Sequence, residues 1–206
     1  MTDKIDFKKT LDSYHSPHDR FEIVDIPDMQ YLMVDGHGDP NTSSAYTDAL
    51  AALYPVAYKL KFASKRELGR DYVVPPLEGL WWAEDMDAFT ASRDKSRWDW
   101  TMMLMVPNWI DHSIFEAAVA RAGAKDAPTL LADVHLRPLS EGRCVQTLHI
   151  GSFDDEAPVL ERMHHEFIPE NGLRMNGKHH EIYFSDFRKV AAEKLRTILR
   201  QPVSLA

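Results

Sequence analysis

Apolar and polar positions alternate in several short segments of the chain, which is the pattern of a half-buried β-strand. Residues 21–26 and 30–34 show this alternation and predict two strands broken at a proline. Residues 97–106 form a longer, mostly apolar run that predicts a buried strand. Residues 134–137 and 144–150 flank a glycine-containing turn and predict a hairpin. The chain is therefore expected to contain a substantial sheet.

Helical periodicity separates these strands. Residues 45–60 place apolar side chains at helical spacing, and Pro55 inside this run predicts a kink or a break. Residues 114–122 and 156–167 predict two more helices, and the tail, residues 190–200, predicts a last one. Strands and helices together indicate an α+β fold.

Two predicted strands carry a glutamate among aromatic residues. They are the segments PPLEGLWW (residues 75–82) and HHEIYFSD (residues 179–186). Strand side chains alternate between faces, so Glu181 and Tyr183 point the same way, about 7 Å apart along the backbone. A carboxylate on an aromatic face either finds a hydrogen-bond partner or has its pKa raised, because desolvation penalises the charged form. Glu78 and Glu181 are therefore candidates for binding or chemistry.

The order of elements repeats once along the chain. A strand, a glycine-containing turn, a helix and an aromatic strand with a glutamate span residues 30–82 and again residues 144–184. Identity between the halves is slight, so the repeat concerns architecture. It predicts one pseudo-twofold domain over residues 21–206, preceded by a loosely attached arm over residues 1–20. It also predicts that the two carboxylates approach one central cleft.

Composition and charge narrow the class of protein. The chain has 206 residues, 44% hydrophobic and 27% charged, which suits a folded domain with a full core. Its net charge of −8 and its scattered basic residues lack the basic footprint of direct nucleic-acid binding. The single Cys144 excludes an intramolecular disulfide, and the chain shows neither a signal-peptide pattern nor an apolar run of membrane-spanning length. These features predict a cytoplasmic protein without a membrane partner, and they leave its oligomeric state open.

Histidines and the cysteine show no familiar catalytic or metal-binding spacing. The adjacent pairs His164-His165 and His179-His180 point their side chains apart on a helix or a strand, and no HExxH pattern occurs. Cys144 lies within a predicted strand, and no serine has a Gly-x-Ser-x-Gly elbow. We therefore expect neither a metal nor a cofactor.

Three segments resemble the GyrI-like small-molecule-binding family, in particular its stand-alone members. They are residues 72–82 (YVVPPLEGLWW), residues 180–186 (HEIYFSD) and residues 193–202 (EKLRTILRQP). The resemblance extends from residue 21 to the C-terminus. It implies two βαββ units of the SHS2-like kind, related by a pseudo-twofold axis, with a ligand cleft between them.

The resemblance implies two kinds of function. Some members are the effector-sensing halves of transcription regulators and bind hydrophobic cations through aromatic and acidic residues. Certain stand-alone members resemble hydrolases that open the strained cyclopropane of DNA-alkylating natural products and so detoxify them. The resemblance places Glu78, Trp81 or Trp82, Glu181 and Tyr183 at the cleft.

Under the hydrolase hypothesis we assign catalysis to Glu181, Tyr183 and Glu78. The Glu181 carboxylate orients and deprotonates water, and the Tyr183 phenol donates a hydrogen bond to developing negative charge. Glu78 divides the acid and base roles with Glu181 if both face one apolar cleft. The alternative for Glu181 and Tyr183 is a solvated sheet face, and for Glu78 the surface of an edge strand beside two prolines.

Ligand contacts are assigned to side chains that suit flat, delocalised molecules and cations. Trp81 and Trp82 point to opposite faces of their strand, and Trp82 shares the face of Glu78. Trp98 and Trp100 share a face with apolar neighbours, which favours a core position. The assigned ligand-binding residues are Trp81, Trp82, Trp100, Trp109 and Met105. Packing in the core is the alternative for each tryptophan.

Two rival functions remain open. A non-catalytic protein that sequesters or senses lipophilic, often cationic, compounds needs the same pocket of aromatic residues and carboxylates. A docking module for another protein, such as a topoisomerase, does not need acidic, aromatic strands and ranks last. A pair of carboxylates within water-bridging reach favours hydrolysis, whereas a single buried glutamate among aromatic residues favours cation binding.

Overall fold

A computed structural model describes residues 4–84 and 94–206 of the chain. Within these residues, nine strands form one antiparallel sheet. The strands are β1 (Glu22–Ile26), β2 (Met29–His37), β3 (Leu77–Trp82), β4 (Asp99–Val106), β5 (His135–Leu139), β6 (Gly142–Ile150), β7 (Leu173–Met175), β8 (His179–Tyr183) and β9 (Arg196–Leu205).

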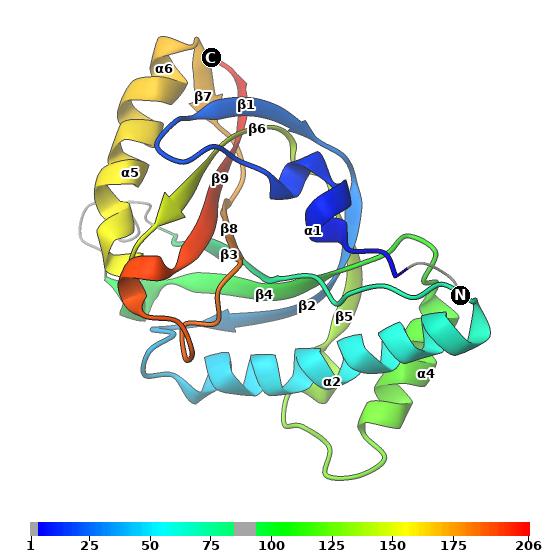
Figure 1. Ribbon diagram of the computed structural model, residues 1–206. Helices are drawn as coiled ribbons and strands as arrows, with labels where there is room; N and C mark the ends of the chain where they lie inside the picture. Colours follow the sequence, from blue (N-terminus) through cyan, green and yellow to red (C-terminus); the bar gives the residue numbers. More distant parts are fainter. Residues whose placement is uncertain (1–3, 85–93) are drawn as a thin grey trace.

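The longer helices lie between these strands and pack on the outside of the sheet, whereas the short α1 precedes β1 and lies inside its curl (Figure 1). The α-helices are α1 (Phe7–Thr10), α2 (Ser44–Glu67), α4 (His112–Ala122), α5 (Ala157–Arg162) and α6 (Ile168–Glu170), and a π-helix, η5 (Met163–Phe167), joins the last two. The short 3₁₀ turns are η1 (Asp12–Tyr14), η2 (Lys95–Arg97), η3 (Leu131–Asp133), η4 (Phe153–Glu156) and η6 (Ala192–Lys194). Of the two alternatives predicted at Pro55, a kink or a break, the break is wrong, because α2 continues through this residue.

The strand order is β1-β6-β9-β8-β3-β4-β2-β5, and β7 pairs with β9. The units β2-α2-β3-β4 and β6-α5-β8-β9 are two βαββ repeats, and β3 of the first pairs with β8 of the second. The predicted α+β class and its tandem βαββ architecture are confirmed. The pseudo-twofold axis passes between the two strands that carry the glutamates.

Two short connections link β1 and β6, at one end of the strand order, to β2 and β5, at the other end. Only Pro27 and Asp28 separate β1 from β2, and only Ser140 and Glu141 separate β5 from β6. The sheet therefore curls strongly, and Figure 1 shows it wrapping around α1. The predicted hairpin is wrong, because β5 pairs with β2, whereas β6 pairs with β1 and β9.

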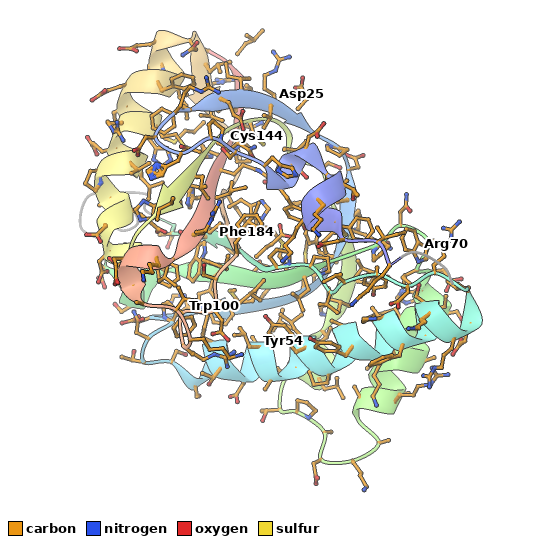
Figure 2. All side chains as sticks on the ribbon, in the orientation of Figure 1. Asp25, Tyr54, Arg70, Trp100, Cys144 and Phe184 are labelled. Atoms are coloured by element: carbon orange, nitrogen blue, oxygen red, sulfur yellow. The ribbon has the colours of Figure 1, made fainter. Side chains whose placement is uncertain are left out.

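The curled sheet has an inner and an outer face. The inner face holds a cluster that includes Tyr14, Leu80, Met103 and Ile182. On the outer face, α2 and α4 cover one half of the sheet, and α5 and α6 cover the other. Figure 2 shows Trp100 between the sheet and α2.

The predicted C-terminal helix is wrong, because residues 192–194 form only a 3₁₀ turn and residues 196–200 belong to β9. Leu195, Ile198 and Leu199 have helical spacing, but all three are buried around a central strand of the sheet. A strand that is buried on both faces lacks the alternation by which strands are recognised.

The N-terminal arm is bound firmly rather than loosely. Ile5 forms a β-bridge with Tyr72, and His18 forms one with Leu148. Between these bridges Tyr14 is 4% exposed and enters the inner face of the sheet. The arm therefore closes part of the space inside the curl.

Candidate functional site

The outer face of the sheet carries a hydrogen-bonded cluster beside the pseudo-twofold axis. Pairing of β3 with β8 places Gly79 opposite Glu181 and Trp81 opposite His179. The Tyr183 hydroxyl donates to Glu181 Oε2 at 2.7 Å, and the Trp81 indole N–H donates to the Tyr183 oxygen at 2.8 Å. We call Glu181, Tyr183 and Trp81 the Glu181 cluster.

Gly79 makes room for this cluster. A Cβ atom at Gly79 would lie 2.7 Å from Trp81 Nε1 and 3.2 Å from the Tyr183 hydroxyl. A larger residue would displace the indole or the phenol, since such contacts are shorter than van der Waals separation. The glycine in PPLEGLWW therefore has a positional reason in this site.

Burial sets the protonation of the phenol. Burial raises the pKa of Tyr183 well above its usual value, and the negative charge of Glu181 raises it further. Tyr183 therefore stays protonated at neutral pH and acts as a hydrogen-bond donor. Glu181 is 9% exposed, and its Oε1 lies 3.5 Å from Nε2 of His179. The cluster thus combines a carboxylate acceptor with a phenol donor.

His164 is a second buried histidine, and it lies beside His179. The rings of His164 and His179 have centroids 6.1 Å apart and are nearly perpendicular. His164 lies in the π-helix η5, an irregularity that is frequent at functional sites. Burial lowers the pKa of His164 to about 3, and the nearby His179 and His165 add to this effect. His164 is therefore neutral at physiological pH.

Both helical layers bring aromatic side chains to the Glu181 cluster. Phe153 of η4 meets Tyr183 edge-on, with ring centroids 5.7 Å apart. Tyr46 of α2 packs against the core cluster that contains Trp81, and its ring meets Trp100 edge-on, with centroids 5.8 Å apart. Burial raises the pKa of Tyr46, and the charge of Glu181 adds to this effect. Aromatic surfaces of this kind suit planar or cationic ligands.

Glu156 at the end of η4 brings a second carboxylate to this face. It is 3% exposed, and its charge contributes to the raised pKa of Tyr183. Neither Glu156, Phe153 nor Tyr46 was predicted as a site residue. They come from three-dimensional packing of separate elements onto β8, for which the local sequence pattern carries no signal.

Glu78 lies on the inner face, in a buried network of its own. The Tyr14 hydroxyl donates to Glu78 Oε1 at 2.6 Å, and Nε2 of His180 lies 2.9 Å from Glu78 Oε2. Nδ1 of His180 lies 2.9 Å from Glu141 Oε1, and Arg200 donates to Glu141 Oε2 at 3.1 Å. We call these five residues the Glu78 network.

Charges in the Glu78 network compensate one another. Burial opposes a charged imidazole, but Glu141 and then Glu78 outweigh it and raise the pKa of His180. Burial likewise favours a neutral Glu141, but His180 and Arg200 lower the pKa of Glu141 to about 2. Arg200 also donates to the backbone carbonyl of Ser13 in the arm. Two carboxylates thus balance one imidazolium and one guanidinium in a site closed by the arm.

The expectation that both carboxylates approach one cleft is wrong. In the pairing of β3 with β8, Glu78 lies opposite Ile182, and Glu181 lies opposite Gly79. Consecutive positions of a strand point to opposite faces, so Glu78 and Glu181 point away from each other across the sheet. A regular pairing over five positions leaves no bulge that would change this.

The five residues assigned to ligand contact lie at separate places. Trp81 belongs to the Glu181 cluster, and Trp82 lies on the inner face, as their predicted opposite directions require. Trp100 is fully buried beneath α2, and Met105 is buried on the inner face. Trp109 donates to the Ser64 hydroxyl at 3.0 Å and packs against the end of α2. The structure therefore brings only Trp81 to Glu181 and Tyr183.

The GyrI-like small molecule binding domain matches residues 20–204. This chain belongs to the GyrI-like family. Among curated proteins, none matches the chain.

Solved structures of GyrI-like relatives are similar over almost the whole chain. An uncharacterized conserved protein from Listeria innocua is 41% identical with a TM-score of 0.88, and a hydrolase encoded by lin2189 from the same organism is 40% identical with a TM-score of 0.85. Each match covers 98% of this chain and 100% of the other. The C-terminal domain of EcmrR, at 11% identity and a TM-score of 0.58, covers 91% of this chain and 98% of its own and shares the fold.

In residues 4–84 and 94–206, no group of three or more His, Cys, Asp or Glu side chains is placed to hold a metal ion. None of the helices in this part of the chain is long and apolar enough to cross a membrane.

Proposed function

We propose that this GyrI-like protein binds hydrophobic, planar small molecules at the Glu181 cluster and hydrolyses the strained cyclopropane of DNA-alkylating natural products. The observation that carries the proposal is the buried hydrogen bond from Tyr183 to Glu181, which Trp81 supports from the neighbouring strand. The similarity to a Listeria innocua hydrolase over the full chain agrees with it.

The proposed reaction adds one water molecule to the ligand. Glu181 accepts a proton from water, and the water oxygen forms a bond to the cyclopropane methylene carbon. The strained C–C bond breaks, and its electron pair moves into the conjugated dienone, which becomes a phenolate. The phenolate takes up a proton from solvent and Glu181 returns its proton to solvent, so that the product is the substrate plus water and the carboxylate is restored. Ring strain and aromatisation drive the reaction, and no cofactor takes part.

Tyr183 and the surrounding aromatic residues have defined tasks in this proposal. Tyr183 stays protonated and hydrogen-bonds Glu181, which orients the carboxylate for the incoming water. Phe153 and Tyr46 hold the flat ring system of the ligand from the two helical layers. Glu78 has no part in the step, because it faces the inside of the sheet.

Turnover of a cyclopropane-bearing indole compound tests the proposal. Purified protein is incubated with the compound, and the ring-opened product is followed by mass spectrometry. We expect Glu181→Gln to lower kcat/KM by about 100- to 10,000-fold, because the general base is lost. Glu170→Gln changes an exposed glutamate of α6 in the same way and serves as the matched control. Product formation at the buffer rate in the parent protein would contradict the hydrolase.

Non-catalytic binding of lipophilic cations is the second candidate. Glu181 is a nearly buried carboxylate among aromatic side chains, and Glu78 does not share its face. This arrangement attracts a delocalised cation through charge and through aromatic surfaces. Saturable binding of an aromatic cation that Glu181→Gln abolishes, without product from the cyclopropane compound, would favour this function.

A further inference from the structure

A pocket of about 460 Å³ opens on the inner face of the sheet, away from the Glu181 cluster. Its apolar walls include Met33, Leu80 and Trp82, and its polar walls include Asp35, Arg137 and Lys178. These residues come from the strands β2, β3 and β5 and from the position just before β8. The mouth of a strongly curled sheet is a common place for a small-molecule site.

Strand register explains why charged and apolar side chains meet there. Trp82 pairs with Asp99, and Leu80 pairs with both Thr101 and His180. Leu80 thus separates the pocket from the Glu78 network, to which His180 belongs. The pocket and the Glu78 network therefore occupy neighbouring parts of the space inside the curled sheet.

Most of the charges in the pocket already have partners. Asp35 accepts a hydrogen bond from the Thr101 hydroxyl at 2.7 Å and one from Arg137 at 3.0 Å. Asp99 Oδ1 lies 2.8 Å from Nδ1 of His37. Asp35 of β2 is thus engaged with donors on β4 and β5, and Asp99 of β4 lies beside His37 of β2.

Lys178 differs from these groups. Its ammonium lies 3.1 Å from the ring centroid of Trp82, and in residues 4–84 and 94–206 no acceptor lies within hydrogen-bonding distance of it. Burial lowers the pKa of Lys178, although Asp35 and Asp99 act in the opposite direction. A half-buried ammonium with three donors gains most from an anionic acceptor.

We propose that this pocket is a second binding site, for a small amphipathic anion such as an aryl carboxylate. The carboxylate of the ligand accepts a hydrogen bond from the Lys178 ammonium, and its apolar body lies against Leu80, Met33 and the exposed part of Trp82. This site is separate from the Glu181 cluster and does not depend on its proposed chemistry, because the sheet lies between them.

Calorimetry with a matched pair of probes tests the second site. The probes are 2-naphthoate and 2-naphthylmethylammonium, which share an apolar body and differ in charge. We expect 2-naphthoate to bind at one site with a higher affinity than the ammonium compound. Lys178→Met keeps an unbranched apolar stem and removes the ammonium, and we expect it to raise the Kd of 2-naphthoate at least about tenfold, since a charge-assisted hydrogen bond is lost.

Two control variants separate this site from other lysines and from the outer face. Lys189→Met removes an exposed lysine, and Glu181→Gln alters the Glu181 cluster. Both are expected to leave the Kd of 2-naphthoate within about twofold. The proposal is overturned by unchanged binding of 2-naphthoate in Lys178→Met or by its loss in Glu181→Gln. It is also overturned if 2-naphthoate shows no saturable binding up to about 10 mM.

Discussion

Glu78 and Glu181 lie on neighbouring strands of one sheet, but their surroundings differ. Each oxygen of Glu78 has a close partner, from Tyr14 and His180, and the side chain is 0% exposed. Glu181 receives one short hydrogen bond, from Tyr183, and its other oxygen lies 3.5 Å from His179. Both oxygens of Glu78 are therefore engaged, whereas Glu181 retains the capacity to accept a proton or a further hydrogen bond.

This difference separates a stabilising role from a chemical one. A buried carboxylate whose partners complete a balanced network contributes to the fold, and removing its charge leaves an uncompensated cation. A carboxylate with an unfilled oxygen beside a protonated phenol is poised to bind a ligand or water. Burial alone does not distinguish the two roles, since both glutamates are buried.

The largest expected effect is on stability at the inner face. Glu78→Gln leaves the His180 imidazolium without one of its two carboxylates, and we expect the free energy of unfolding to fall by about 3–5 kcal/mol. The matched change Glu181→Gln weakens one hydrogen bond and is expected to cost about 1–2 kcal/mol. Urea unfolding monitored by circular dichroism measures both. Equal losses in the two variants would contradict the distinction between the faces.

Acid should destabilise the fold through the inner network, because the unfolded state takes up a proton at Glu141 at a higher pH than the folded state does. The pKa of Glu141 is about 2 in the folded protein and 4.5 as its ordinary value, so its stabilising contribution is present above pH 4.5 and is lost as the pH falls toward 2. The loss amounts to about 3 kcal/mol, because each pKa unit corresponds to about 1.4 kcal/mol. Urea unfolding at several pH values measures it.

The pKa of the Glu141 carboxyl group can also be measured directly. Carbon-13 NMR follows the titration of individual carboxyl groups in the folded protein. A Glu141 carboxyl that titrates near its ordinary value would show that His180 and Arg200 do not hold its charge. His164 also destabilises the fold on acidification, because its lowered pKa makes the unfolded state bind the proton first. Only the carboxyl titration separates the two.

Local sequence patterns predicted much of this fold. Alternation along the segments 75–82 and 179–186 gave the two central strands, and it correctly sent Trp81 and Trp82 to opposite faces. The repeated order of elements predicted a pseudo-twofold domain, and the resemblance to the GyrI-like family implied its tandem βαββ units. Such features depend on neighbours in the sequence, so one chain suffices to recognise them.

Relations between distant strands were harder to predict. We expected Glu78 and Glu181 to be related by the pseudo-twofold axis. An axis perpendicular to a sheet, however, relates only residues that lie on the same face. The counterpart of Glu78 in β8 is therefore an inner residue, His180 or Ile182, and never Glu181. A one-residue difference in register decides this, and the sequence carries no local signal for it. The site partners Tyr46 and Phe153 depend on helix packing in the same way.

The smallest expected effect compares two tyrosines that each donate to one of the glutamates. Tyr14→Phe removes the 2.6 Å hydrogen bond to Glu78, and we expect a loss of about 1.5–3 kcal/mol in the free energy of unfolding, because the acceptor is charged and buried. It should leave ligand turnover at the outer face unchanged. Tyr183→Phe removes the 2.7 Å hydrogen bond to Glu181 and should instead lower turnover by about 10- to 100-fold, with a smaller loss of stability. If Tyr14→Phe slowed turnover as much as Tyr183→Phe, the two faces would be coupled through β3 and β8, and the arm would belong to the reaction.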